Sequence, residues 1–171
     1  MQKIIFIGTI HGFTPIEDLK EIFREYKPNL ILVEICQEDI DKNSIDSYPK
    51  EMIETCCWAK KNKIKIAGFD SNINIFAEGK TEKDNQKLME EQDRIIKKHN
   101  WKKFNKKWFM ESLDEDDNFT DKNKFRLRQE KMFGNIKKNL IPDGTNIILT
   151  GAGHLAFFEE KFPGAVFPLR N

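Results

Sequence analysis

The chain has 171 residues, which fits a single domain (1–171) with a buried core. Its 29 lysines and arginines nearly balance 28 aspartates and glutamates, so the net charge of +1 gives no reason to expect binding to nucleic acid or to a membrane. The three cysteines form no disulfide framework and no apolar run is long enough to cross a bilayer, so we expect a cytoplasmic protein.

Short apolar runs alternate with amphipathic segments along the chain. The expected strands are 3–8, 29–34, 64–67 and 146–150, and the expected helices are 14–26, 48–62 and 154–161. Thr14 and Pro15 predict the N-cap and the first turn of the first helix. The inner stripe of the second helix is expected to be Met52, Ile53, Cys56 and Cys57. Residues 165–168 could add an edge strand, because Pro168 argues against a central position.

This alternation predicts an α/β fold with a mostly parallel central sheet flanked by helices. A long helical insertion, at about 80–140, precedes the last main strand. Within it, Trp101, Phe104 and Trp108 have helical spacing and predict one apolar stripe, buried either against the domain or in a homodimer. The acid-rich segment 111–121 is expected to be an exposed loop.

Two similar motifs follow the first and the last main strands. In the first motif, Gly8 stands at the end of the strand and His11 follows three residues later. In the second, Gly151 follows the last main strand and is followed three residues later by His154. Glycine allows the tight turn that places each histidine at the carboxyl end of a strand, where open parallel sheets bind ligands. A single histidine in such a place is often only a hydrogen-bonded turn residue, but two in matching settings favour a shared site.

Two acidic residues end the intervening strands. Glu34 follows a buried apolar run, and a carboxylate in such surroundings needs a partner. Asp70 follows the third strand and either contributes to the same site or caps the next segment. Residues 151–156 also fit a dinucleotide-binding fingerprint, but the second half of such a fold is missing, so nucleotide binding is not expected.

The pattern resembles the TraB/PrgY/GumN–Tiki family of the erythromycin esterase/ChaN-like superfamily. The resemblance rests on the two Gly-x-x-His motifs, on Glu34 at the end of the second strand, and on Arg128 in a segment that matches the family's Arg-Asn-x-x-Met helix. Gln129 stands where that helix usually has asparagine. Tiki-type members are metal-dependent proteases, so the resemblance implies a divalent metal at His11 and His154. The membrane role of anchored members is not carried over.

These residues predict a hydrolase acting on a peptide, an amide or another small molecule. In the first mechanism, His11 and His154 bind a divalent ion (Mn, Co or Zn), which lowers the pKa of a bound water. Glu34 either completes the coordination of the ion or takes a proton from the bound water. Arg128 pairs with Glu34 or holds a substrate carboxylate, and Asp70 orients a histidine from behind. Two alternatives remain open: a metal-free esterase with a histidine base, and a non-catalytic module that binds a peptide or signal.

Overall fold

The computed structural model describes residues 1–75, 90, 93–113 and 120–170. Within these residues one sheet is formed by β1 (Gln2–Thr9), β2 (Leu30–Val33), β3 (Lys65–Gly68) and β4 (Gly144–Gly151). The strand order is β1-β4-β2-β3, and every neighbouring pair is parallel. The expected α/β fold with a parallel central sheet is confirmed.

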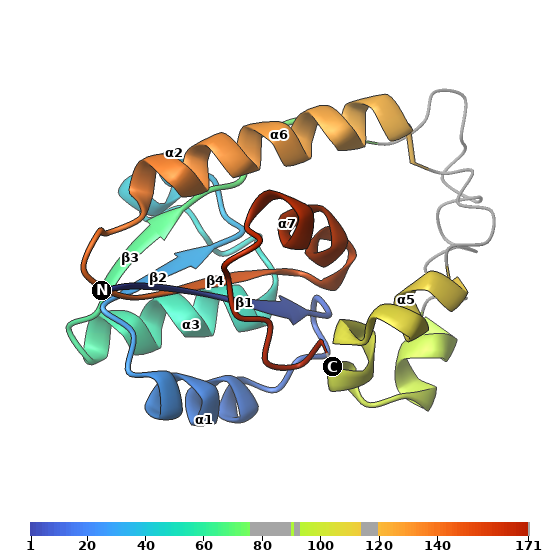
Figure 1. The fold of residues 1–171 in the computed structure, drawn as a ribbon, viewed down its shortest axis with the longest axis horizontal. Coiled ribbons are helices and arrows are strands. Elements are labelled where there is room, and N and C mark those ends of the chain that lie inside the picture. The colour runs from blue at the N-terminus through green and yellow to red at the C-terminus, as the bar shows by residue number, and fades with distance from the viewer. Residues whose placement is uncertain (76–89, 91–92, 114–119, 171) are drawn as a thin grey trace.

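Helices cover both faces of this sheet (Figure 1). The described helices are α1 (Ile16–Tyr26), α2 (Gln37–Asp41), α3 (Lys50–Lys61), the 3-10 helix η1 (Trp101–Asn105), α5 (Lys107–Leu113), α6 (Lys122–Asn139), the 3-10 helix η2 (Ala152–His154) and α7 (Leu155–Lys161). Helices α1 and α3 pack on one face, whereas α6 and α7 pack on the other. None of the helices in the described residues combines the length and the apolar character that spanning a lipid bilayer requires.

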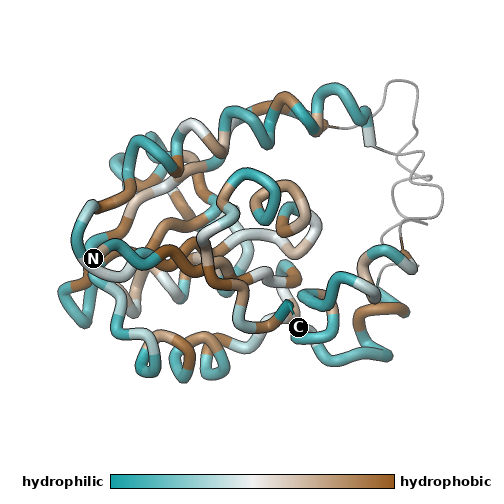
Figure 2. Tube along the Cα trace, viewed as in Figure 1, coloured by the Kyte–Doolittle hydropathy of each residue, from teal (hydrophilic) through white to brown (hydrophobic). Residues whose placement is uncertain are grey.

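The strands divide their side chains between two cores, one on each face of the sheet. Along β1, Ile5 and Ile7 belong to the core beneath α1 and α3, whereas Phe6 belongs to the core beneath α6 and α7. Successive side chains of a strand point to opposite faces, so both faces of these apolar runs are buried. In Figure 2 the strands at the centre are mainly hydrophobic (brown), whereas the outer helices alternate between hydrophilic (teal) and hydrophobic residues.

The edge strand β1 is covered by a segment near the C-terminus. Ile5 and Val166 form a parallel bridge, in which Phe6 N donates to Val166 O at 2.9 Å and Val166 N donates to Ile4 O at 2.9 Å. The expected edge strand at 165–168 is therefore reduced to a single bridge. Pro168 lies just beyond it, where no further pairing is needed.

Two local expectations are wrong. Thr14 does not cap α1, because its hydroxyl instead bonds the backbone of Ile10, accepting from N at 2.8 Å and donating to O at 3.2 Å. Pro15 is the N-cap residue and makes no side-chain capping bond. On α3 the buried stripe includes Met52 but turns away from Cys57, which is exposed.

The single aromatic stripe expected in the insertion is also wrong. Lys106 has extended backbone angles and separates η1 from α5, so Trp101 and Trp108 lie on different helices. Trp101 is buried and its Nε1 donates to Asp18 Oδ2 at 2.8 Å, whereas Trp108 is 62% exposed. Residues 76–89, 91–92 and 114–119 of the region lie outside the described residues, which leaves most of the acidic segment 111–121 undescribed.

Candidate active site

The strand order brings the polar strand ends together. Because β4 lies between β1 and β2, the loop after β4 is flanked by the loop that carries His11 and by Glu34. The register places Val33 beside Leu149, so the next residue of β2, Glu34, lies beside the end of β4. All of these loops leave the carboxyl edge of the sheet, on the side of the molecule where α5 lies (Figure 1).

Glu34 is the most heavily bonded side chain of the group and is only 5% exposed. Its Oε2 accepts hydrogen bonds from Thr150 Oγ1 and from the Gly151 backbone N, each at 2.7 Å. Its Oε1 lies 3.3 Å from Arg128 Nη2 and 3.3 Å from His154 Nε2. These four contacts occupy the lone-pair positions that a carboxylate offers.

The protonation of Glu34 follows from these contacts. Burial favours the neutral acid, but the charge and hydrogen bond of His154, the charge of His11 and the Gly151 amide outweigh it. The pKa of Glu34 is therefore held well below its usual range, and Glu34 is a buried carboxylate ion.

Asp70 holds Arg128 rather than a histidine. Arg128 Nε and Nη2 donate to the two oxygens of Asp70 at 2.8 and 2.7 Å, a bidentate pair. The same Nη2 reaches Glu34, so the expected contact between Arg128 and Glu34 is present and is shared. The expectation that Asp70 orients a histidine is wrong. Asp70 Oδ1 also accepts from Ser71 N at 2.7 Å, but no helix begins at the residues that follow, 71–75, so this contact is not a helix cap.

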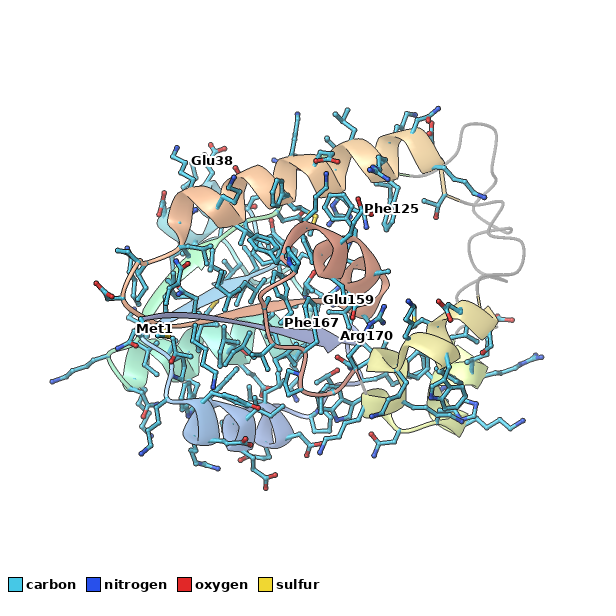
Figure 3. All side chains as sticks on the ribbon, viewed as in Figure 1. Met1, Glu38, Phe125, Glu159, Phe167 and Arg170 are labelled. Atoms are coloured by element: carbon cyan, nitrogen blue, oxygen red, sulfur yellow. The ribbon has the colours of Figure 1, made fainter. Side chains whose placement is uncertain are left out.

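His154 is buried, at 6% exposure, and both of its ring nitrogens have partners. Nε2 faces Glu34, and Nδ1 lies 3.3 Å from the side-chain Nε2 of Gln129. The ring also stacks on Phe125 of α6, with centroids 5.0 Å apart and an angle of 15° between planes. Figure 3 labels Phe125 beside α6. An amide nitrogen can only donate, so Gln129 Nε2 donates to Nδ1 and the ring's Nε2–H donates to Glu34. His154 is thus a fixed, shielded group.

His11 is the accessible histidine, with 44% of its side chain exposed. Its Nδ1 lies 2.9 Å from Glu51 Oε1, and Glu51 itself is only 1% exposed. The second oxygen of Glu51 accepts from the Gly12 backbone N at 3.0 Å, which fixes the carboxylate. The Nε2 of His11 has no hydrogen-bond partner among the described residues. This nitrogen is therefore the available acceptor of the site when Nδ1 carries the proton.

The surroundings of His11 favour its charged form. Burial opposes the imidazolium, but the Glu51 hydrogen bond and the negative charges of Glu34 and Glu51 outweigh burial, so the pKa of His11 is raised above its usual value. Sequence reasoning missed Glu51. It lies 40 residues from His11 in the chain, in the first turn of α3, where an acidic residue is expected merely for the helix dipole.

His11, Glu34 and His154 converge above Gly151. A Cβ atom built on Gly151 would lie 3.3 Å from His11 Nε2, 3.6 Å from Glu34 Oε2 and 3.7 Å from His154 Cδ2. Three side chains from the ends of three strands therefore surround one point, as the two Gly-x-x-His motifs led us to expect.

The site does not fit a metal centre with three protein ligands. Among the described residues, no three or more His, Cys, Asp or Glu side chains are grouped so that they could hold a metal ion. The oxygens of Glu34 already have four partners, and one of these, the guanidinium of Arg128, brings a positive charge to the carboxylate.

Comparisons with protein-family models, with curated proteins and with solved structures give no match for this chain.

Proposed function

We propose that the protein is a hydrolase of ester or amide bonds in which His11 is the general base that activates water. The observation that carries this proposal is the His11–Glu51 pair, 2.9 Å between Nδ1 and Oε1, with Nε2 left facing the convergence point. A buried carboxylate that holds one imidazole nitrogen fixes the tautomer and the orientation of a catalytic base and stabilises its charged form.

The reaction follows from this arrangement. His11 Nε2 removes a proton from water while the water oxygen bonds to the carbonyl carbon of the substrate. The tetrahedral intermediate then breaks its bond to the leaving oxygen or nitrogen, which takes the proton back from His11 Nε2. The products are a carboxylic acid and an alcohol or amine. Glu51 and Glu34 stabilise the imidazolium that exists between the two proton transfers.

Arg128 is the candidate for stabilising charge on the substrate. Two of its nitrogens are bound to Asp70 and Glu34, but Nη1 makes no hydrogen bond with a described residue. The N–H groups of Nη1 can therefore donate to a carbonyl oxygen or to a carboxylate of the substrate. His154 acts indirectly in this proposal, by holding Glu34 in place.

Membership of the TraB/PrgY/GumN–Tiki family remains a proposal. It is supported by the proximity of the residues that carry the resemblance, because His11, Glu34, Arg128 and His154 all contribute to one network. Metal-dependent peptide hydrolysis, which the resemblance implies, is less well supported, since the described side chains do not provide three ligands.

A panel of 4-nitrophenyl esters and aminoacyl 4-nitroanilides tests the proposal, with and without a chelator. We expect chelator-resistant hydrolysis by the wild type and its loss in His11→Ala. His99→Ala is the matched control, because His99 lies in the insertion and contacts Lys103 and Phe109. Hydrolysis that disappears with chelator would favour the metal-dependent mechanism. Hydrolysis that survives His11→Ala would contradict the assigned base.

A further inference from the structure

The backbone does not require a glycine at position 151. Gly151 has φ −58° and ψ 138°, values that any L residue adopts. The nearest atoms to a Cβ built there belong to the side chains of His11, Glu34 and His154, at 3.3 to 3.7 Å. Gly8 is different, because its Cβ would lie 2.6 Å from Leu155 Cδ1 and would disturb the core. The fold therefore does not require a glycine at position 151, and the lack of a side chain there keeps the space between His11, Glu34 and His154 open.

We propose that the space above the Cα of Gly151 is the position of the attacking water in the reaction, an inference that rests on the function proposed above. The space is bordered by His11 Nε2, which lacks a described partner, and by the carboxylate of Glu34. His11 Nε2 carries a lone pair without a described partner, so it can accept a hydrogen bond from a water, whereas the oxygens of Glu34 already contact Thr150, Gly151, Arg128 and His154. A water there donates to Nε2, and the charge of Glu34 stabilises the imidazolium that forms when the proton moves.

The decisive variant fills this space without adding charge. Gly151→Ala places one methyl group 3.6 Å from Glu34 Oε2, an ordinary van der Waals contact, and 3.3 Å from His11 Nε2, a tight contact that the imidazole relieves by shifting a few tenths of an ångström. Gly153→Ala is the matched control in the same loop, because a Cβ at Gly153 meets no atom within 4 Å. We expect Gly151→Ala to lower kcat/KM about 100-fold, since displacing a reacting group by about 1 Å has effects of that size. The kcat/KM of Gly153→Ala should stay within about twofold of the wild-type value, and both variants should have the melting temperature of the wild type.

A crystal structure of the wild type gives a second readout that does not depend on activity. We expect an ordered water within hydrogen-bond distance of His11 Nε2, above the Cα of Gly151. A protein side chain in that space, or wild-type activity in Gly151→Ala, would overturn the assigned water position. If His11→Ala abolishes hydrolysis while Gly151→Ala does not, the water position alone is wrong. If His11→Ala retains hydrolysis, the proposed function is wrong as well.

Discussion

The two histidines that follow β1 and β4 differ in exposure and in the partners of their ring nitrogens. His154 is enclosed by Phe125, Gln129 and Glu34, whereas His11 is half exposed and keeps one nitrogen available. The matching Gly-x-x-His motifs gave no sign of this difference. Its cause lies in residues from other segments, above all Glu51, which spacing along the chain does not reveal.

Glu51→Gln should lower the pKa of His11. The substitution removes a negative charge and weakens the hydrogen bond that stabilises the imidazolium. With three histidines in the chain, each ring can be followed separately by NMR titration. His99 is the internal control and should titrate unchanged. An unchanged pKa for His11 in Glu51→Gln would contradict the paired arrangement.

The same pair makes stability depend on pH. Because the pKa of His11 is raised in the folded state, the pair stabilises the fold fully below the unfolded-state pKa of about 6.5. This contribution is lost as pH rises through the folded-state pKa. The free energies of unfolding of the wild type and of Glu51→Gln, measured with denaturant, should therefore differ more at about pH 5.5 than at about pH 8.5. A difference that grows toward high pH would have the wrong sign.

Arg128→Ala should destabilise the protein by about 3–5 kcal/mol, because it leaves the carboxylates of Glu34 and Asp70 buried without their cation. Lys102→Ala is the control. Lys102 is half-exposed and pairs with Asp18 at 3.5 Å, a contact that contributes about 1 kcal/mol at most. Thermal or denaturant melting measures both. Equal, small losses for the two variants would count against a structural role for the Arg128 network.

At the scale of elements, η1 and α5 of the insertion pack against the loops that carry the site. Phe104 and Phe109 form a small core together with Ala152, and Ile10 packs against this core. Ile10 precedes His11 and Ala152 follows Gly151, so the insertion supports the two loops that meet at the convergence point. A homodimer is not needed to bury Trp101, which packs in the chain's own core, and the homodimer stays a prediction.

Asn105 is the residue through which η1 holds the end of β1. Its buried amide donates to Gly8 O and accepts from Gly8 N, both at 2.9 Å, in place of a neighbouring strand. Asn105→Ala should therefore speed hydrogen exchange at the Gly8 amide by at least about tenfold, equivalent to about 1.4 kcal/mol of lost protection. Asn100→Ala, which removes only the cap at Lys102 N, should leave that exchange unchanged. Equal exchange in both variants would mean that Asn105 does not hold β1.

Truncation of Trp101 should cost far more stability than truncation of Trp108. Trp101→Ala should cost about 3–5 kcal/mol, because a buried indole and its bond to Asp18 are lost. Trp108→Ala should change stability by less than about 1 kcal/mol, since that ring lies mostly in solvent. Chemical denaturation compares the two. Similar losses would restore the single-stripe interpretation of the insertion.

At the scale of the whole molecule, the sequence predicted the parallel sheet and its strands because apolar runs buried on both faces are easy to recognise. It placed His11, Glu34 and His154 at strand ends for the same reason. The order β1-β4-β2-β3 could not be predicted, because it depends on how the helices pack rather than on any one segment. The break at Lys106 was missed because aromatic spacing alone does not show where a helix ends.

This strand order determines the chemistry available to the molecule. It places the last long strand between two earlier ones, so that Gly151 lies beneath the side chains of His11 and His154, which are 143 residues apart in the chain (154 − 11). The carboxyl edge then presents an accessible imidazole, a buried carboxylate ion and a guanidinium whose Nη1 has no hydrogen-bond partner in the described part of the chain. Figure 3 shows at the same side of the molecule how Arg170 and Glu159, paired at 3.2 Å, tie the C-terminal segment to α7.

The pH dependence of kcat/KM, measured on the best substrate of the panel, tests the central claim most directly. A general base works only when it is unprotonated, so the rate should rise with pH and level off above the pKa of the base. We predict that the midpoint of this rise coincides with the pKa of His11 measured by NMR on the same protein, above about 6.5. A midpoint at a pH where His11 does not titrate would contradict the assignment of His11 as the base.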